Sequence, residues 1–427
     1  MKKKQQDTAQ QTVWPYPRIY SFLTTRYTAP KFCYSPNTRR ARTVLAPAVH
    51  TTTRHALADT RNGCTMAITR NTKNVPYYLL GAGAFDQLES LVDERRRAAT
   101  GPALFFVDHY FQNKPLAARV PAIAGDRVFF VNTSAEPTVE VVDAFASTAK
   151  AFLNGAQPCC VTGIGGGAVL DMAKAVANLL TNPGLAEEYQ GWELVKHPAP
   201  YKIGVPTLSG TGAECSRTCV LTNMRRKLKL GMNSDFTVYD QLLLDPELTR
   251  SVPRDQYFYT GLDTFMHCVE SIRGSYRNVI VDSLSRTAIA MSEEIFLGDK
   301  DMMDEENLEK MMVASYIGGM AAGNVGIIHP VSAGLSIVLH MPHGIANCYA
   351  LSVLGEFYPE EHAQFTEMMA RQKVSLPKGI CKNLTDEQLD GLYQGSIVHE
   401  KPLINALGED FKKILTREKV LSLFANM

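Results

Sequence analysis

The chain lacks any hydrophobic run long enough to cross a membrane. No segment approaches the roughly 18 to 20 uninterrupted apolar residues of a spanning helix, and no signal-peptide segment follows the N-terminal lysines. An excess of charge is missing too, because the formal net charge is only +1. No overall field therefore favours nucleic acid, an anionic membrane or a polyanionic substrate as a partner. We expect a cytoplasmic globular protein.

Cysteines in the spacing of a zinc ribbon or a disulfide framework are also missing. The nine cysteines are scattered, and neither Cys159-Cys160 nor the pair Cys215 and Cys219 is repeated along the chain. We expect reduced, mostly buried thiols. The length of 427 residues, with 45% hydrophobic and 20% charged residues, predicts two folded domains.

Acidic residues are scarce in residues 1–65, where Asp7 and Asp59 are the only carboxylates among many lysines, arginines and threonines. We expect this basic leader to lie outside the fold, either as a disordered tail or because translation begins at Met66. A transit peptide or a nucleic-acid-binding arm is the alternative.

The rest of the chain alternates short β-rich runs with segments of helical periodicity, the pattern of a parallel sheet covered by helices. The predicted strands are 77–80, 103–107, 127–131, 159–164 and 202–205, and the predicted helices between them are 85–97, 138–153 and 169–180. After Asp245-Pro246 the periodicity is that of successive helices. The sequence thus predicts an α/β domain over residues 66–248 and an all-α domain over residues 249–427.

A glycine-rich loop follows the fourth predicted strand and opens a helix. Gly165, Gly166 and Gly167 come directly after the strand, and Asp171 and Lys174 follow within the helix. Consecutive glycines let the backbone approach a pyrophosphate, and the helix N-terminus offers free N–H groups to hold it. Tight strand-to-helix turns also use glycine without any ligand, so the loop alone indicates a dinucleotide only weakly.

Two further features support a dinucleotide site. Residues 206–214 form a second loop of small residues at a strand end, with Thr207, Ser209 and Thr211 as its hydroxyl groups. Asp108 ends the strand 103–107, where a carboxylate can accept hydrogen bonds from a ribose and repel a 2′-phosphate. We therefore expect NAD in preference to NADP, although an aspartate there can also cap a helix.

Four side chains suggest a divalent-metal site. Asp263 and His267 are four residues apart in a helical segment, so both lie on one face of the helix. His329 and His343 lie in an apolar region, where a histidine without a partner is costly. One carboxylate and three imidazoles suit Fe(II), Zn(II) or Mn(II) and leave a position for a substrate oxygen. The remaining histidines have no assigned role, and His399 is interpreted as a surface residue.

In their order along the chain, these motifs resemble those of the iron-containing, or group III, alcohol dehydrogenase family, from Val75 to the C-terminus. The matching segments are Gly165–Lys174, Pro206–Glu214, Gly261–His267 and His343-Gly344. The resemblance implies a dehydroquinate synthase-like superfold with NAD(P) on the first domain and a metal in the cleft between the domains. It also implies that Asp263, His267, His329 and His343 are the metal ligands. The residues that it assigns to the cofactor are Asp108, the glycine loop, Thr207, Ser209, Thr211 and Lys229.

Within the family, residues 189–196 and 245–261 are similar to the branch that oxidises 3-deoxy-D-manno-octulosonate at carbon 8. That branch supplies a pyridoxal-phosphate aminotransferase in the synthesis of an 8-amino sugar of lipopolysaccharide, with NAD(P) or dioxygen as the acceptor. The alternatives are an NAD(P)-dependent dehydrogenase of a small alcohol, polyol or sugar phosphate, and a metal-binding scaffold whose activity has decayed.

The sequence departs from the family at Ala333 and in a shorter chain after His343, and it leaves the partner of a substrate carboxylate open. Ala333 stands four residues after His329, where the family usually has a proton-relaying histidine, so no protein base is assigned. Arg217, Arg273 and Arg277 are candidate partners for a substrate carboxylate. We expect a homodimer.

Overall fold

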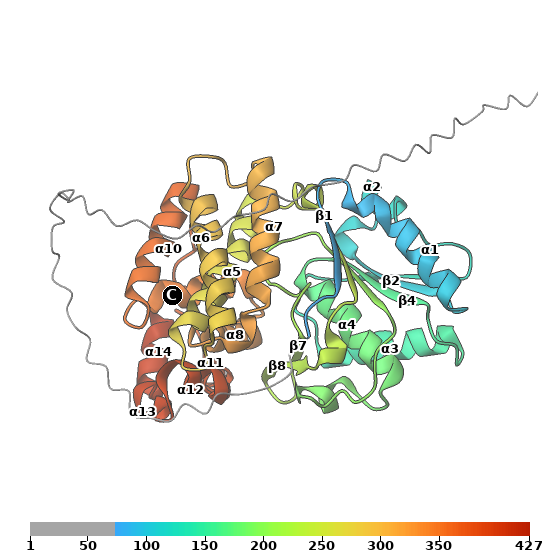
Figure 1. The fold of residues 1–427 in the computed structure, drawn as a ribbon. Coiled ribbons are helices and arrows are strands. Elements are labelled where there is room, and N and C mark those ends of the chain that lie inside the picture. The colour runs from blue at the N-terminus through green and yellow to red at the C-terminus, as the bar shows by residue number, and fades with distance from the viewer. Residues whose placement is uncertain (1–72) are drawn as a thin grey trace, which may run out of the picture. The chain divides into compact units, whose positions relative to one another are not determined.

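The computed structural model describes residues 73–427 (Figure 1). The predicted leader, residues 1–65, and the predicted start at Met66 lie outside the described residues. Across the described part of the chain, no helix is long and apolar enough to span a membrane.

A parallel six-stranded sheet forms the first domain, in the strand order β1-β9-β6-β4-β2-β3. Its strands are β1 (Tyr77–Leu80), β2 (Ala103–Asp108), β3 (Arg127–Val131), β4 (Cys160–Gly165), β6 (Lys202–Pro206) and β9 (Gln241–Leu244). The central strands are buried on both faces, as their continuous apolar runs predict. The helices of this domain are α1 (Leu88–Ala98), α2 (Pro115–Ala118), α3 (Val139–Leu153) and α4 (Gly167–Thr181).

A smaller sheet that the sequence did not predict adjoins the first domain. It contains β5 (Gly191–Trp192), β8 (Leu228–Asn233) and β7 (Thr218–Asn223), with β7 and β8 paired as an antiparallel hairpin. The hairpin lies between β6 and β9 in the chain, so its residues reach the same end of the sheet as the second predicted cofactor loop.

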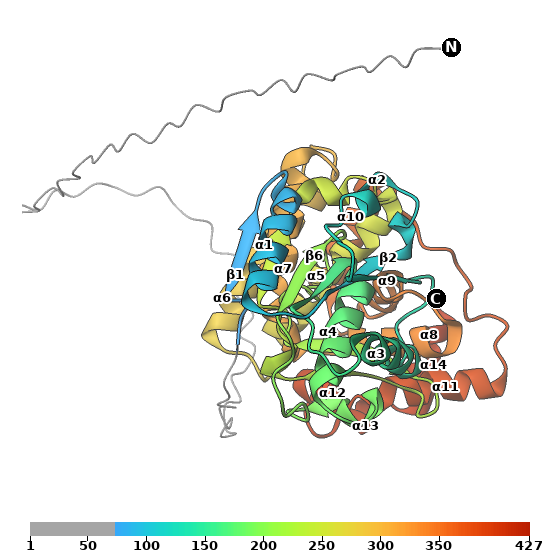
Figure 2. The same ribbon diagram turned by 90° about the vertical axis from the view of Figure 1, so that its right-hand side faces the viewer.

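Helices make up the second domain, which confirms the predicted fold class (Figure 2). They are α5 (Arg254–Arg273), α6 (Val279–Leu297), α7 (Glu305–Gly319), α8 (Ile328–Leu339), α9 (His343–Val353), α10 (Pro359–Gln372), α11 (Asp386–Ile397), α12 (Glu400–Leu407), α13 (Phe411–Ile414) and α14 (Arg417–Ala425). Residues 257–271 of α5 are buried without interruption, so this helix is the centre of the domain.

The loop after β6 joins the two domains through backbone contacts. The carbonyl of Gly210 accepts a hydrogen bond from Thr264 Oγ1 (2.7 Å), and its N–H donates to Ser315 Oγ (2.8 Å). Gly210 has φ +140°, and a Cβ there would lie 1.7 Å from the carbonyl oxygen of Thr260. Only glycine fits this contact, because a side chain would overlap backbone atoms.

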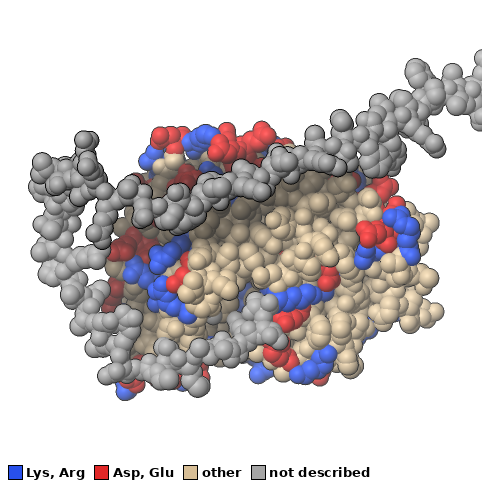
Figure 3. All heavy atoms as spheres, in the orientation of Figure 1, with Lys and Arg blue, Asp and Glu red and all other residues tan. Residues whose placement is uncertain are grey.

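Charged side chains of both signs are interspersed on the face shown in Figure 3, outside the part that grey atoms cover. This face therefore carries no extended patch of one sign, in keeping with the net charge of +1.

Candidate metal centre and cofactor cavity

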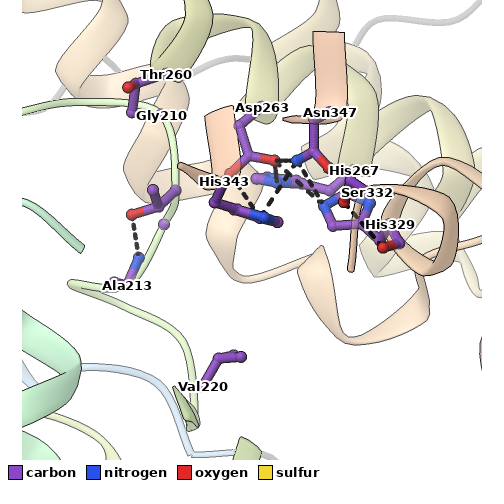
Figure 4. A network of polar contacts seen from close by, with 12 residues as sticks. Gly210, Ala213, Val220, Thr260, Asp263, His267, His329, Ser332, His343 and Asn347 are labelled. Atoms are coloured by element: carbon purple, nitrogen blue, oxygen red, sulfur yellow. Dashed lines mark hydrogen bonds and ion pairs between the residues drawn. The ribbon is translucent and has the colours of Figure 1, made fainter. Parts of the chain in front are cut away.

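Three helices bring the four predicted metal ligands together (Figure 4). Asp263 and His267 lie one turn apart on α5, His329 is in the first turn of α8, and His343 begins α9. Ligand atoms of Asp263, His267 and His329 all lie within 4.8 Å of one another. His343 Nε2 lies 3.4 Å from Asp263 Oδ2. The residues therefore converge on one point, as their pattern in the sequence predicts.

The donor set fits a divalent cation. His267 Nδ1 lies 3.9 Å from Asp263 Oδ1, and a ring nitrogen of His267 belongs to the cluster with Asp263 and His329. Asn347, one turn after His343, donates from Nδ2 to Asp263 Oδ1 (2.7 Å) and so fixes this carboxylate. Buried imidazoles beside an oriented carboxylate are ligands that Fe(II) and Zn(II) accept.

Electrostatics within this cluster also favour a cation. Burial raises the pKa of Asp263, but the charge interaction with His343 and the hydrogen bonds of His267 and His329 outweigh burial and hold it well below its usual range. Burial lowers the pKa of His329, and the carboxylates of Glu270 and Asp263 outweigh it, so the pKa is raised to about 9. The carboxylates thus attract positive charge, and a metal ion has to displace the protons that His267 and His329 otherwise hold. Burial and the charge of Lys229 lower the pKa of His343 to about 4, so this ligand is already neutral.

Glu270 supports the metal centre and was missed from the sequence. Its Oε1 accepts a hydrogen bond from the Ile328 N–H (2.5 Å), and its Oε2 contacts His329 Nδ1. A carboxylate behind a ligating histidine orients the ring and fixes its tautomer. The signal was available, because Glu270 follows His267 by three residues and lies on the same side of α5.

A cavity of about 920 Å³ connects the metal cluster with the predicted cofactor loops. Predicted site residues on its wall are Asp108, Gly166, Gly167, Asp171, Thr207, Thr211, Lys229, Asp263, His267, His329 and His343. Gly165, Lys174 and Ser209 are not on the wall. The Lys174 ammonium is fully buried, where it donates to the carbonyl of Ala213 (2.8 Å) and pairs with Asp171 (3.3 Å), so it holds the second loop in place.

Asp108 caps a helical turn and also lies on the wall of the cavity, so its position agrees with both predicted roles. Its Oδ1 accepts hydrogen bonds from the Tyr110 N–H (2.9 Å) and from Thr133 Oγ1 (3.0 Å), and it caps the helical turn that follows. The same side chain lines the cavity at the end of β2. A capping role therefore leaves this carboxylate beside the cofactor site.

Lys229 and Glu136 link the first domain to the fourth ligand. Lys229 Nζ lies 3.3 Å from Glu136 Oε2 and 3.4 Å from His343 Nδ1. Glu136 Oε1 accepts the backbone N–H of His343 (2.8 Å), so one carboxylate caps α9 and holds the lysine. Glu136 was also missed, because 207 residues separate it from His343.

Two interpretations of single residues need correction. None of the three arginines considered for a substrate carboxylate lines the cavity, and each is paired with acidic residues: Arg217 with Glu193 and Asp235, Arg273 with Glu360 and Glu361, and Arg277 with Asp282. His399 is not a surface residue, since it lines the cavity and its Nε2 is buried. Ala333 lies on the same wall.

Comparison with known proteins identifies the family. Residues 76–246 match the model of the iron-containing alcohol dehydrogenases, and residues 257–392 match the model of the Fe-containing alcohol dehydrogenase family, C-terminal part. The chain is 31% identical over 296 residues to a sulfoacetaldehyde reductase of Bilophila wadsworthia, covering 67% of this chain and 74% of that protein. It is 28% identical over 283 residues to alcohol dehydrogenase 4 of Saccharomyces cerevisiae, covering 65% of this chain and 72% of that protein.

Solved structures share the fold. A sulfoacetaldehyde reductase from Bifidobacterium kashiwanohense in complex with NAD+ aligns with a TM-score of 0.68 at 22% identity, over 84% of this chain and 98% of that one. The NADH-dependent butanol dehydrogenase A of Thermotoga maritima aligns with a TM-score of 0.65 at 20% identity, over 84% of this chain and 99% of that one.

The chain belongs to the iron-containing alcohol dehydrogenase family. It is an oxidoreductase of this type that acts on CH–OH groups, and the iron for which the family is named agrees with the predicted divalent metal. The NAD+ bound in the reductase structure fits the predicted dinucleotide cofactor. The predicted enzyme class is thereby confirmed, against the alternative of a decayed scaffold.

Proposed function

We propose that this protein interconverts a primary alcohol and its aldehyde by hydride transfer to and from NAD. One observation carries the proposal: the cluster of Asp263, His267, His329 and His343 and the glycine loop at the start of α4 line the same cavity. A site that brings an alcohol oxygen and a nicotinamide together needs both features in one enclosed space.

One group of residues serves the alcohol and another serves the nicotinamide cofactor. Asp263, His267, His329 and His343 would hold a divalent ion, which would supply Lewis-acid polarisation of the hydroxyl group. Gly166 and Gly167 leave the N-terminus of α4 open to a pyrophosphate, and Asp108 on the cavity wall would accept hydrogen bonds from the ribose. Ala333 has no group that accepts a proton, so the proton of the alcohol leaves through water or through a hydroxyl of the substrate.

Turnover by defined metal forms tests this proposal. Protein loaded with Fe(II) or Zn(II) to equal occupancy is expected to consume NADH with short aldehydes and to produce NADH with the matching alcohols. His343→Ala is expected to bind less metal and to lose turnover. Peroxide is followed in parallel, since peroxide without NADH change would make dioxygen the acceptor. If neither metal form consumed or produced NADH, the proposal would be contradicted.

The narrower substrate that we propose is 3-deoxy-D-manno-octulosonate, oxidised at carbon 8 before an aminotransferase acts in lipopolysaccharide synthesis. The segment 189–196, which carries the similarity to that branch, includes β5, and its Trp192 lies on the cavity wall. The relatives are named instead for sulfoacetaldehyde and simple alcohols. Comparing kcat/KM for the octulosonate, sulfoacetaldehyde and butanal ranks these candidates, and no turnover of the octulosonate would remove the narrower proposal.

We also propose a homodimer that forms along the edge of the main sheet. β1 is the terminal strand, and its four residues are exposed, with Tyr77 at 65% and Leu79 at 39%. An apolar edge strand with free backbone groups favours pairing with a second chain. Leu79→Lys is expected to shift the mass measured by light scattering toward the monomer, and a wild-type monomer would contradict the proposal.

A further inference from the structure

A second histidine nitrogen in the cavity has no partner. Among residues 73–427, two buried histidine ring nitrogens lack a hydrogen bond, His267 Nε2 and His399 Nε2, and both side chains line the same cavity. Buried polar atoms are nearly always paired, so each such nitrogen needs an explanation. His267 belongs to the candidate metal cluster, whereas no group among the described residues pairs with His399 Nε2.

The packing of two helices brings His399 to this wall. α11 crosses α8 at Gly395 and Gly334, where a Cβ on Gly334 would lie 2.7 Å from the carbonyl oxygen of Leu392. This close crossing places the end of α11 beside the turn of α8 that carries Ala333. His399 lies two residues after the end of α11 and occupies the N-cap position of α12, where its carbonyl accepts the Leu403 N–H, so its backbone is held between the two helices.

His399 is uncharged near neutral pH. Burial lowers its pKa to about 4, and the positive charges of Lys229 and His329 act in the same direction. A neutral imidazole forms hydrogen bonds with hydroxyl groups as donor or as acceptor, according to its tautomer. It offers an anion no net charge, and the neighbouring cation Lys229 already lies against Glu136.

We propose that His399 is a substrate-binding residue that hydrogen-bonds a second hydroxyl of the substrate, one that lies near the reacting carbon. The inference rests on the proposed function and narrows it to polyhydroxy alcohols and their aldehydes. A site built around a hydrogen bond discriminates against an analogue that lacks the hydroxyl, because the buried nitrogen is then left unpaired.

The test compares two aldehydes of equal length, glyceraldehyde and propanal, with NADH as the reductant. The measured quantity is the ratio of kcat/KM for glyceraldehyde to kcat/KM for propanal. His399→Leu is expected to lower this ratio about tenfold, which is the usual effect of one hydrogen bond between neutral groups. His399→Gln keeps a hydrogen-bonding side chain, so its ratio is expected to lie between those of the wild type and His399→Leu. His197→Leu makes the same change at an exposed histidine and is expected to leave the ratio unchanged.

The outcomes distinguish a failure of the role proposed for His399 from a failure of the proposed function. Metal content, NADH affinity and thermal stability are measured for every variant, so that a folding defect is distinguished from lost substrate contact. A ratio that is equal in wild type and His399→Leu overturns the role of His399 while leaving the proposed function intact. Wild-type protein that reduces neither aldehyde in either metal form, but still binds metal and NADH, overturns the proposed function and this inference with it.

Discussion

Replacing Glu270 by glutamine is expected to weaken metal binding without disrupting the fold. The carboxylate is 1% exposed and accepts from two groups, the Ile328 N–H and the Nδ1 of His329. Glutamine has the same size but only one acceptor oxygen, so one of these donors faces an NH₂ group instead. Loss of such a contact behind a ligating histidine reduces metal affinity about 10- to 100-fold, or about 1.4 to 2.7 kcal/mol.

Competition with a chelator of known affinity measures this change, using Fe(II) and Zn(II) in separate titrations. Glu309→Gln, at an exposed position on α7, is the matched control and is expected to bind metal like the wild type. NADH affinity of the metal-free variants shows whether the first domain is intact. Glu270→Gln with wild-type metal affinity would refute the assignment of Glu270 as the group that orients His329.

Three further predictions concern the cofactor, the domain contact and pH. Asp108→Gly is expected to raise kcat/KM with NADPH at least about tenfold relative to NADH, since a carboxylate on the wall repels a 2′-phosphate; an unchanged preference would contradict its role. Gly210→Ala is expected to destabilise the protein by about 2 kcal/mol or more in denaturant unfolding, because its Cβ overlaps the Thr260 carbonyl. Gly81→Ala is the control: Gly81 has the same φ of +140° but no atom within 4 Å of an added Cβ, so this variant measures the backbone strain alone. The pKa of His399 in the folded protein, about 4, lies below its ordinary value of 6.5. Its contribution to the free energy of unfolding is therefore complete above pH 6.5 and is lost as the pH falls toward 4. His399→Leu is expected to make the free energy of unfolding less dependent on pH in this window, and an equal pH dependence in the variant and the wild type would contradict the shift.

The main sheet and the pair of Asp263 and His267 could be predicted because their signals are local, whereas His329 and His343 were added through their apolar surroundings and the order of the family's motifs. The i, i+4 spacing of Asp263 and His267 defines a helix face, and apolar runs define the strands of the main sheet. The β7–β8 hairpin was missed, although residues 228–233 alternate apolar with polar or small side chains as a half-buried strand does. Local spacing indicates secondary structure well and contacts between distant segments poorly.

Residues that act through tertiary contacts were beyond local patterns. Glu136 meets His343 across 207 residues of chain, and no spacing rule connects them. His399 has polar neighbours in sequence and therefore resembles a surface residue, yet the crossing of α8 and α11 places it on the cavity wall. Lys174 belongs to a cofactor motif but binds the backbone of the second loop, because its long side chain passes inward from α4.

The contact of Gly210 with Thr260 has a consequence for the rate of the reaction. The dinucleotide loops belong to one domain and the metal ligands to the other, so the effective molarity of the two reactants depends on how closely the domains approach each other. A misplacement of about 1 Å between reacting atoms can cost about 100-fold in rate. A glycine and a backbone carbonyl, neither of which takes part in the chemistry, would thereby set the alignment on which the proposed hydride transfer depends.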